Sequence, residues 1–93
     1  MTLAFTSLGT STLTGNAGVE QAIAVKKQLR SQLPFVEGAF PMLVPDPETR
    51  LCEVRVAFDR SFPRAESWTD RAAELAPGIW EKVQRQSRER VPG

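Results

Sequence analysis

The chain has 93 residues, 41% of them hydrophobic and 25% charged, which fits one soluble globular domain and excludes a collagen-like, coiled-coil or wholly disordered chain. Twelve Lys and Arg residues against 11 Asp and Glu residues leave a formal net charge of +1, a smaller basic excess than nucleic-acid-binding domains usually carry. No window approaches about 18 consecutive apolar residues, so we expect no membrane span.

Two residue types that carry much enzyme chemistry are absent or scarce. The sequence has no His and a single Cys, Cys52. Ser-His-Asp and Cys-His arrangements, and zinc sites built on His or paired Cys, therefore cannot form within one chain. Asp70 and Glu74 are one helical turn apart, but such acids usually belong to a solvated face. We expect no catalytic residue, no metal site and no cofactor, and we hypothesise that the chain is not an enzyme.

The N-terminal segment is uncharged and rich in Thr, Ser and Gly. Residues 1–18 contain no ionisable side chain, and Thr10, Thr12 and Thr14 recur at period two. Thr favours extended backbone because its branched Cβ stiffens the side chain. We predict that residues 1–16 form an arm or an edge strand, broken near Gly9, while residues 17–91 form a single α+β domain. An uncharged edge is poorly protected against pairing with another chain, although a disordered terminus is the simpler alternative.

Apolar residues at helical spacing predict a helix near residues 18–33 that ends at Pro34. Asn16 is the expected cap, with the helix starting at Ala17 or Gly18. The expected apolar stripe is Val19, Ile23, Leu29 and Leu33.

The segment 50–59 alternates in the manner of a strand with one buried face. The side chains expected in the core are Cys52, Val54, Val56 and Phe58, and we interpret Cys52 as a small buried hydrophobe. The segment 35–44 predicts a partner strand, at an edge or bulged because Pro41 lacks a backbone donor. Turn residues 45–49 join the two segments into a hairpin near 35–59.

One or two C-terminal helices are predicted near residues 63–90. Pro63 fits a first turn, Ser67 is an alternative cap, and Pro77-Gly78 is expected to break or kink the run. The predicted fold class is therefore α+β. It combines a small antiparallel sheet, formed by the N-terminal arm or edge strand and the hairpin, with a packing layer of helices.

The bulky apolar groups beside prolines either fill the core, which is the simpler interpretation, or form a rigid docking surface, which agrees with the uncharged N-terminal segment. We hypothesise a non-enzymatic structural or interaction subunit that assembles with itself or with a larger protein complex, such as a virion or another multi-subunit assembly. With no secretory signal, we expect it in the cytoplasm or as part of a viral particle. The expected partner contacts are Phe5, Leu8, Leu13, Phe40, Met42 and Trp80.

The alternative function is that of a nucleic-acid-associated regulatory protein using the basic C-terminal helix. The residues that would contact phosphate are Lys82, Arg85, Arg88 and Arg90. Trp68 and Trp80 would supply aromatic surfaces on which bases stack. A solvated helix face is the simpler interpretation, because acidic residues alternate with these cations.

Overall fold

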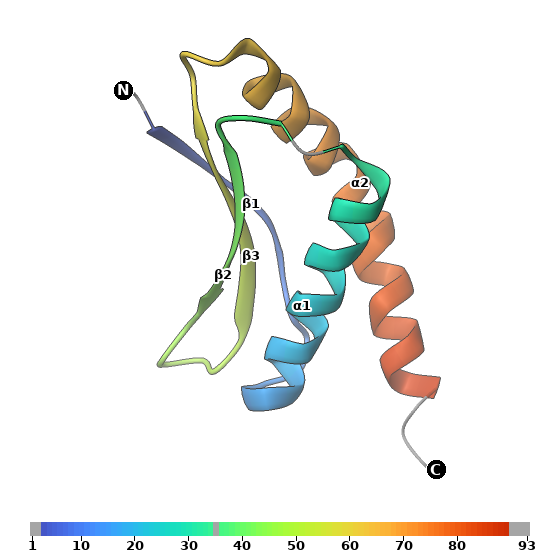
Figure 1. Cartoon of the computed structure of the whole chain (residues 1–93). Helices are drawn as coiled ribbons and strands as arrows, with labels where there is room; N and C mark the ends of the chain where they lie inside the picture. The colour runs from blue at the N-terminus through green and yellow to red at the C-terminus, as the bar shows by residue number, and fades with distance from the viewer. Residues whose placement is uncertain (1–2, 35, 90–93) are drawn as a thin grey trace.

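The computed structural model describes residues 3–34 and 36–89, apart from the side chain of Glu89. It has two helices and a three-stranded sheet, which confirms the predicted α+β class (Figure 1). The elements are β1 (Leu3–Thr10), α1 (Gly15–Gln32), β2 (Ala39–Pro45), β3 (Cys52–Asp59) and α2 (Pro63–Glu89).

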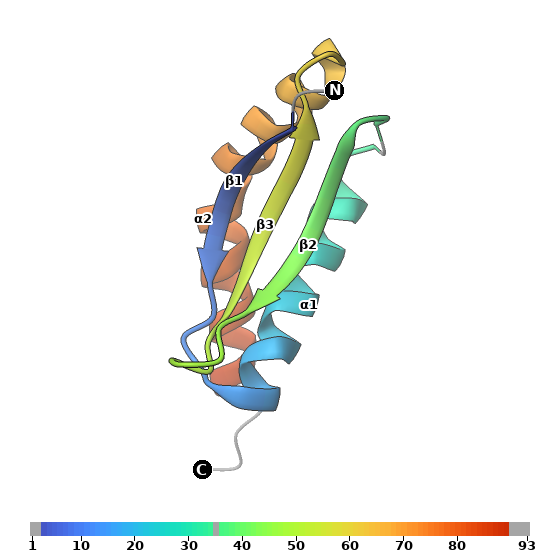
Figure 2. The same ribbon diagram turned by 90° about the vertical axis from the view of Figure 1, so that its left-hand side faces the viewer.

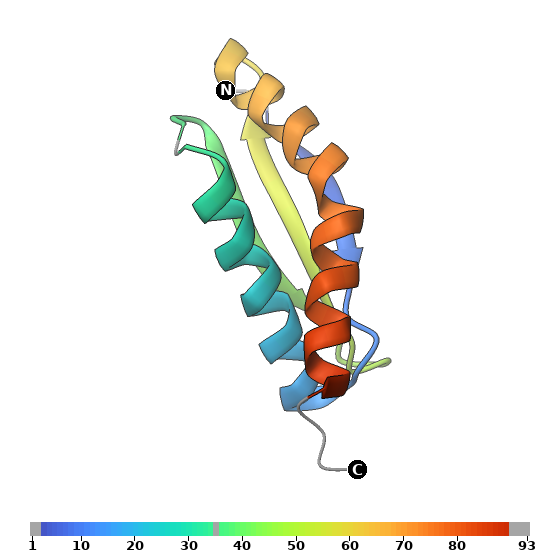
Figure 3. The ribbon, with the colours of Figure 1, turned by 90° about the vertical axis from the view of Figure 1, so that its right-hand side faces the viewer.

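The strand order is β1-β3-β2, and β3 pairs antiparallel with both neighbours. Strands β1 and β2 therefore run parallel to each other with β3 between them, in a split β-α-β arrangement. Both helices lie side by side on one face of the sheet, and the other face carries no helix (Figures 2 and 3). Within the segment predicted as an arm or an edge strand, Leu3–Thr10 is thus an edge strand of the chain's own sheet, while Gly15 and Asn16 already belong to α1.

The central strand β3 confirms the alternation seen in the sequence. Cys52, Val54, Val56 and Phe58 are all buried beneath the helices. Burial also raises the pKa of the Cys52 thiol, as expected for a side chain that acts as a small hydrophobe. The hairpin is confirmed as well, and its connection spans residues 46–51. Within it, the Asp46 carboxylate accepts the backbone N–H groups of Glu48 (2.8 Å) and Thr49 (3.3 Å).

Helix α1 begins earlier than predicted, and the expected Asn16 cap is wrong. The N-cap is Thr14, with no side-chain capping bond, and the helix starts at Gly15. A tertiary contact replaces the local cap, because the Gly15 N–H donates to the Arg50 carbonyl at 2.7 Å. This bond joins the first turn of α1 to the hairpin connection.

The buried stripe of α1 is also rotated relative to the predicted one. Its described members are Gly18, Gln21, Ala22, Val25 and Leu29, with Leu33 just beyond the helix. Ile23, expected in the core, is 37% exposed. The rotation follows from contacts with the loop before the helix. Buried Gln21 accepts the Thr12 N–H at 3.0 Å, and a Cβ at Gly18 would overlap the Leu13 carbonyl.

The sequence predicted one or two C-terminal helices, and the described part of the chain has one. Helix α2 continues through Pro77 without the break that was considered there. Pro77 and Gly78 are exposed, whereas Ala72 and Ala76 before them and Ile79 after them are buried. Packing against one core on both sides of the proline holds the two halves in one run, although a mid-helix proline is costly by itself.

The end of β1 packs directly against α2. The buried indole N–H of Trp80 donates to the Leu8 carbonyl at 2.6 Å, and the strand register shifts between Ser7 and Thr10. Gly9 lies in this bulge with φ +115°, a conformation that favours glycine. A Cβ at Gly9 would overlap Nε1 of Trp80 and lie 2.8 Å from its Cδ1. The bulge therefore requires both a positive φ and the absence of a side chain.

Two glycine substitutions are expected to have opposite effects on stability. Gly9→Ala combines an unfavourable φ with the overlap at Trp80, so we expect it to lower the free energy of unfolding by about 2 kcal/mol or more. Gly78→Ala adds a methyl group to a helix position with nothing within 4 Å, so we expect a gain of about 0.5–1 kcal/mol. Urea denaturation followed by circular dichroism measures both. Equal stability of the Gly9→Ala variant and the wild type would contradict the packing at the bulge.

Candidate interaction surface

The face of the sheet opposite the helices, here called the open face, carries large exposed apolar side chains. Leu3 and Phe5 of β1 are 49% and 59% exposed, and Phe40 of β2 is 52% exposed. Phe5 and Phe40 both pair in register with Ala57 of the central strand. Ala57 lies on the open face and is nevertheless only 5% exposed, because its large cross-strand neighbours shield it. The row Phe5–Ala57–Phe40 is therefore a continuous apolar strip across all three strands.

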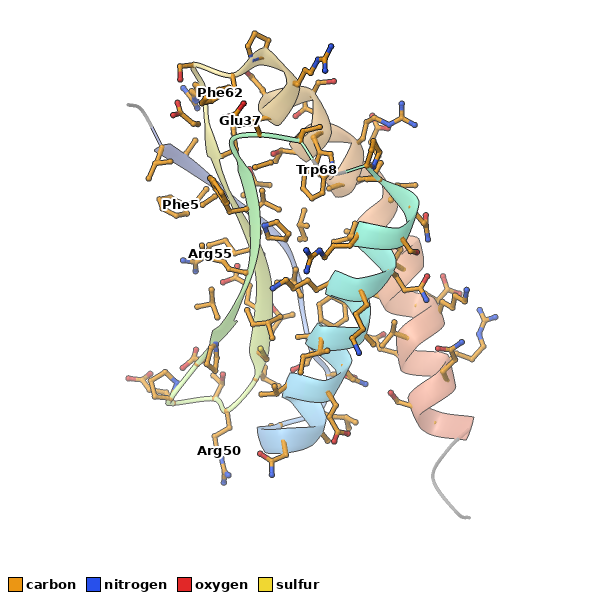
Figure 4. The ribbon with its side chains drawn as sticks, viewed as in Figure 1. Phe5, Glu37, Arg50, Arg55, Phe62 and Trp68 are labelled. Carbon is orange, nitrogen blue, oxygen red and sulfur yellow. The ribbon has the colours of Figure 1, made fainter. Side chains whose placement is uncertain are left out.

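Figure 4 shows the two sides of the sheet clearly. Phe5 and Arg55 project away from the helices, while Trp68 lies on the helix side of the sheet. The local sequence explains the arrangement. In each strand successive side chains alternate between faces, so the odd residues of β1 and β3 and the even residues of β2 reach the open face.

The other half of the open face combines the polar groups of β1 and β3 with Met42 and Val44 of β2. Arg55 pairs in register with Ser7 on one side and with Met42 on the other. Its guanidinium forms an ion pair with the Glu53 carboxylate at 2.7 Å. A hydrogen bond from Ser7, and after it the interactions with Arg55, hold the pKa of Glu53 below its ordinary value. This half of the face therefore presents a compensated pair of charges next to the apolar strip.

The structure brings together only some of the predicted partner contacts. Phe5 and Phe40 are exposed on the open face, and Met42 lies beside them, partly buried. Leu13 is 42% exposed, but it belongs to the turn between β1 and α1 rather than to the sheet. Phe5, Phe40 and Met42 thus share the open face, whereas Leu13 lies apart from it.

Leu8 and Trp80 need correction as partner contacts. They are 4% and 6% exposed and belong to the chain's own hydrophobic core. Leu8 sits on the helix side of β1, and the Trp80 indole is hydrogen-bonded to its carbonyl. Sequence reasoning missed Leu3, although its period-two spacing from Phe5 placed both on one face of the same strand.

The basic residues of the alternative hypothesis lie near the C-terminal end of α2. Lys82, Arg85 and Arg88 are exposed, and Arg90 lies outside the described residues. The Arg85 guanidinium contacts the Glu81 carboxylate at 3.0 Å. Trp68 and Trp80 are buried at 7% and 6% exposure, so neither indole offers a stacking surface beside these cations.

A hollow of about 230 Å³ lies between α1, β2 and α2. Lys26, Arg30, Phe40 and Trp68 are among its lining residues. The Trp68 indole nitrogen is buried without a hydrogen-bond partner among the described residues. The hollow is smaller than the roughly 300–1,000 Å³ of typical ligand pockets. Across residues 3–34 and 36–89, no group of three or more His, Cys, Asp and Glu side chains gathers in a way that would hold a metal ion.

No helix in the described part of the chain is long and apolar enough to cross a membrane. Comparison with protein-family models, with curated proteins and with solved structures found no match.

The Glu53–Arg55 pair generates a pH prediction. The pKa of Glu53 is lowered in the folded chain, so its contribution to stability is present above the ordinary value of 4.5 and is lost as the pH falls through the folded value. At pH 7 we expect Glu53→Gln to lower the free energy of unfolding by about 0.2–1 kcal/mol, the range for partly exposed pairs.

This difference between the wild type and Glu53→Gln should shrink as the pH falls below the ordinary value of 4.5 and through the lowered folded value, because protonated Glu53 is uncharged like Gln. Urea denaturation at a series of pH values measures it. Glu74→Gln, on the exposed surface of α2, serves as the matched control. A difference that stays constant from pH 7 to pH 3 would show that the charge of Glu53 has no role.

Proposed function

We propose that the chain is a non-enzymatic interaction subunit that assembles with itself or with a larger protein complex through the open face of its sheet. The observation that carries this proposal is the strip of Phe5, Ala57 and Phe40, with Leu3 next to it. Single exposed apolar residues are common on soluble proteins, but contiguous apolar patches mark interaction sites. Aromatic side chains are also enriched at the centres of protein interfaces.

The surroundings of the strip support the same function. A polar rim commonly surrounds the apolar centre of an interface, and Ser7, Glu53 and Arg55 supply such a rim along one side of the strip. The charges of Glu53 and Arg55 already compensate each other, so covering them would not leave one isolated charge without a partner.

The structure changes how this function is best tested. Deletion of the first 15 residues would remove β1, with the buried Leu8 and the acceptor of the Trp80 indole. Such a deletion would damage the core together with any interface. Substitutions of exposed side chains on the open face separate the two effects.

A photo-crosslinking amino acid at position 40 is expected to trap a partner of the open face. We expect one discrete adduct when the full chain carries it in cells that make the protein, because Phe40 would lie within an interface. The same amino acid at Ala73, which is exposed on α2, is the control and should give no discrete adduct. Gel electrophoresis and mass spectrometry identify the product.

Competition makes this experiment specific. Excess untagged wild-type protein should abolish a crosslink to a different protein, and should convert a crosslink between two tagged copies into one between a tagged and an untagged chain. Excess Phe40→Ser protein, with an unchanged circular dichroism spectrum, should do neither. An adduct at twice the mass of the chain indicates self-association, and another single mass indicates a different protein. The absence of a competed adduct at position 40 would overturn the proposal.

A further inference from the structure

The free edge of β1 has its backbone hydrogen-bonding groups available over three alternate residues. The Asp59 N–H donates to the Gly38 carbonyl at 2.9 Å, so the odd residues of β3 direct their backbone groups towards β2. Asp59, Ala57 and Arg55 pair in register with Leu3, Phe5 and Ser7. The backbone groups of these three β1 residues consequently point away from β3, to the free edge.

The other edge of the sheet is poorly suited to accept a strand. By the same alternation, Ala39, Pro41, Leu43 and Pro45 of β2 direct their backbone groups outwards. Pro41 and Pro45 have no N–H, so two of these four positions cannot donate. Prolines are a common protection of sheet edges against unwanted pairing, and β1 has none.

The edge of β1 also lacks the charges that usually protect such strands. No ionisable side chain occurs between residues 1 and 18, so two copies of β1 can approach without like charges meeting. The formal net charge of the whole chain is only +1, which gives little repulsion between copies.

The spacing of the three outward-facing residues is symmetric about Phe5. If a second β1 runs antiparallel with Phe5 opposite Phe5, then Leu3 faces Ser7 of the copy and Ser7 faces Leu3. Each of these three pairs would exchange two backbone hydrogen bonds. With a two-fold axis through Phe5, every outward-facing N–H and C=O of these three residues would therefore have a hydrogen-bond partner on the copy.

The same register joins the two open faces. Facing residues of an antiparallel pair place their side chains on one face, with Cα atoms about 5.5 Å apart in a hydrogen-bonded pair. The two Phe5 rings would lie next to each other, and the strip Phe5–Ala57–Phe40 would continue into that of the copy. The backbone would supply the direction of the contact, and the two Phe5 rings would supply additional apolar contact area.

We propose that the partner of the β1 edge is a second copy of the chain, joined antiparallel through the free edges of the two β1 strands with Phe5 on the two-fold axis. This inference goes beyond the proposed function, because it assigns a partner to the β1 edge and leaves the open faces of the two copies exposed as one continuous surface. A strand from a different protein is the alternative occupant, which the experiment distinguishes.

The test compares Phe5→Pro with Phe5→Val in the full chain. Both substitutions remove the aromatic ring, but only proline also removes the backbone N–H that would donate to the copy. The Phe5 N–H points away from β3, so proline removes no bond of the chain's own sheet. Sedimentation velocity between about 1 µM and about 1 mM, a range suited to weak and moderate association, gives the dimer dissociation constant.

We expect the wild type and Phe5→Val to form dimers, and Phe5→Pro to raise the dissociation constant at least tenfold relative to Phe5→Val. Circular dichroism should show equal folding of the two variants. Amide hydrogen exchange of the wild type provides a readout without any substitution. At high concentration the N–H groups of Leu3, Phe5 and Ser7 should become protected, while those of Ala39 and Leu43 should not change.

A wild type that stays monomeric up to about 1 mM would overturn the second copy as partner. The proposed function would then still stand if position 40 crosslinks to a different protein. A dimer unaffected by Phe5→Pro, with no protection of the β1 amides, would overturn the β1 contact and leave self-association through another surface. Loss of both the dimer and the adduct at position 40 would overturn the two proposals together.

Discussion

The hydrogen bond from the Trp80 indole to the Leu8 carbonyl fixes the part of the fold on which the open face depends. It joins residues 72 positions apart and holds the end of β1 against α2. Because the indole occupies the space above Gly9, the strand can bulge there only with a residue that has no Cβ. The regular part of β1 before the bulge then stays paired with β3 at the edge of the sheet.

The two faces of β1 therefore have different roles. Side chains of β1 on the helix side, such as Leu8, contribute to the core. Those on the other side, such as Leu3 and Phe5, remain exposed because both helices lie on the same face of the sheet. A three-stranded sheet covered on one face only can be stable as a single chain while it still presents apolar area to a partner. The proposed function follows from this one-sided covering.

Patterns within one segment were predictable from the sequence, and contacts between distant segments were not. The alternation of β3 identified its buried residues because a period of two reflects the geometry of any strand with one covered face. The same local reasoning failed for Asn16, since the start of α1 is held by a bond to the distant Arg50 carbonyl. It also could not show that Trp80 is buried by a strand more than 70 residues earlier.

The candidate surface was therefore only partly predictable. Phe5 was identified in the uncharged N-terminal segment and Phe40 as a bulky group beside a proline, but their alignment on either side of Ala57 depends on the strand register. A one-residue change in register would move such side chains to the opposite face. Leu8 was assigned to the surface because the face that α2 covers cannot be deduced from β1 alone.

The prolines of β2 have a consequence for how large an assembly of this kind can become. In a pair of chains joined through β1, both outermost strands of the combined sheet would be β2, each with Pro41 and Pro45 on its outer side. Strand-by-strand growth would stop there, because neither end would template a further molecule. In the proposed pair the chain would thus combine one edge that joins a copy with one edge that ends the sheet, and this combination would yield closed pairs rather than open-ended fibrils.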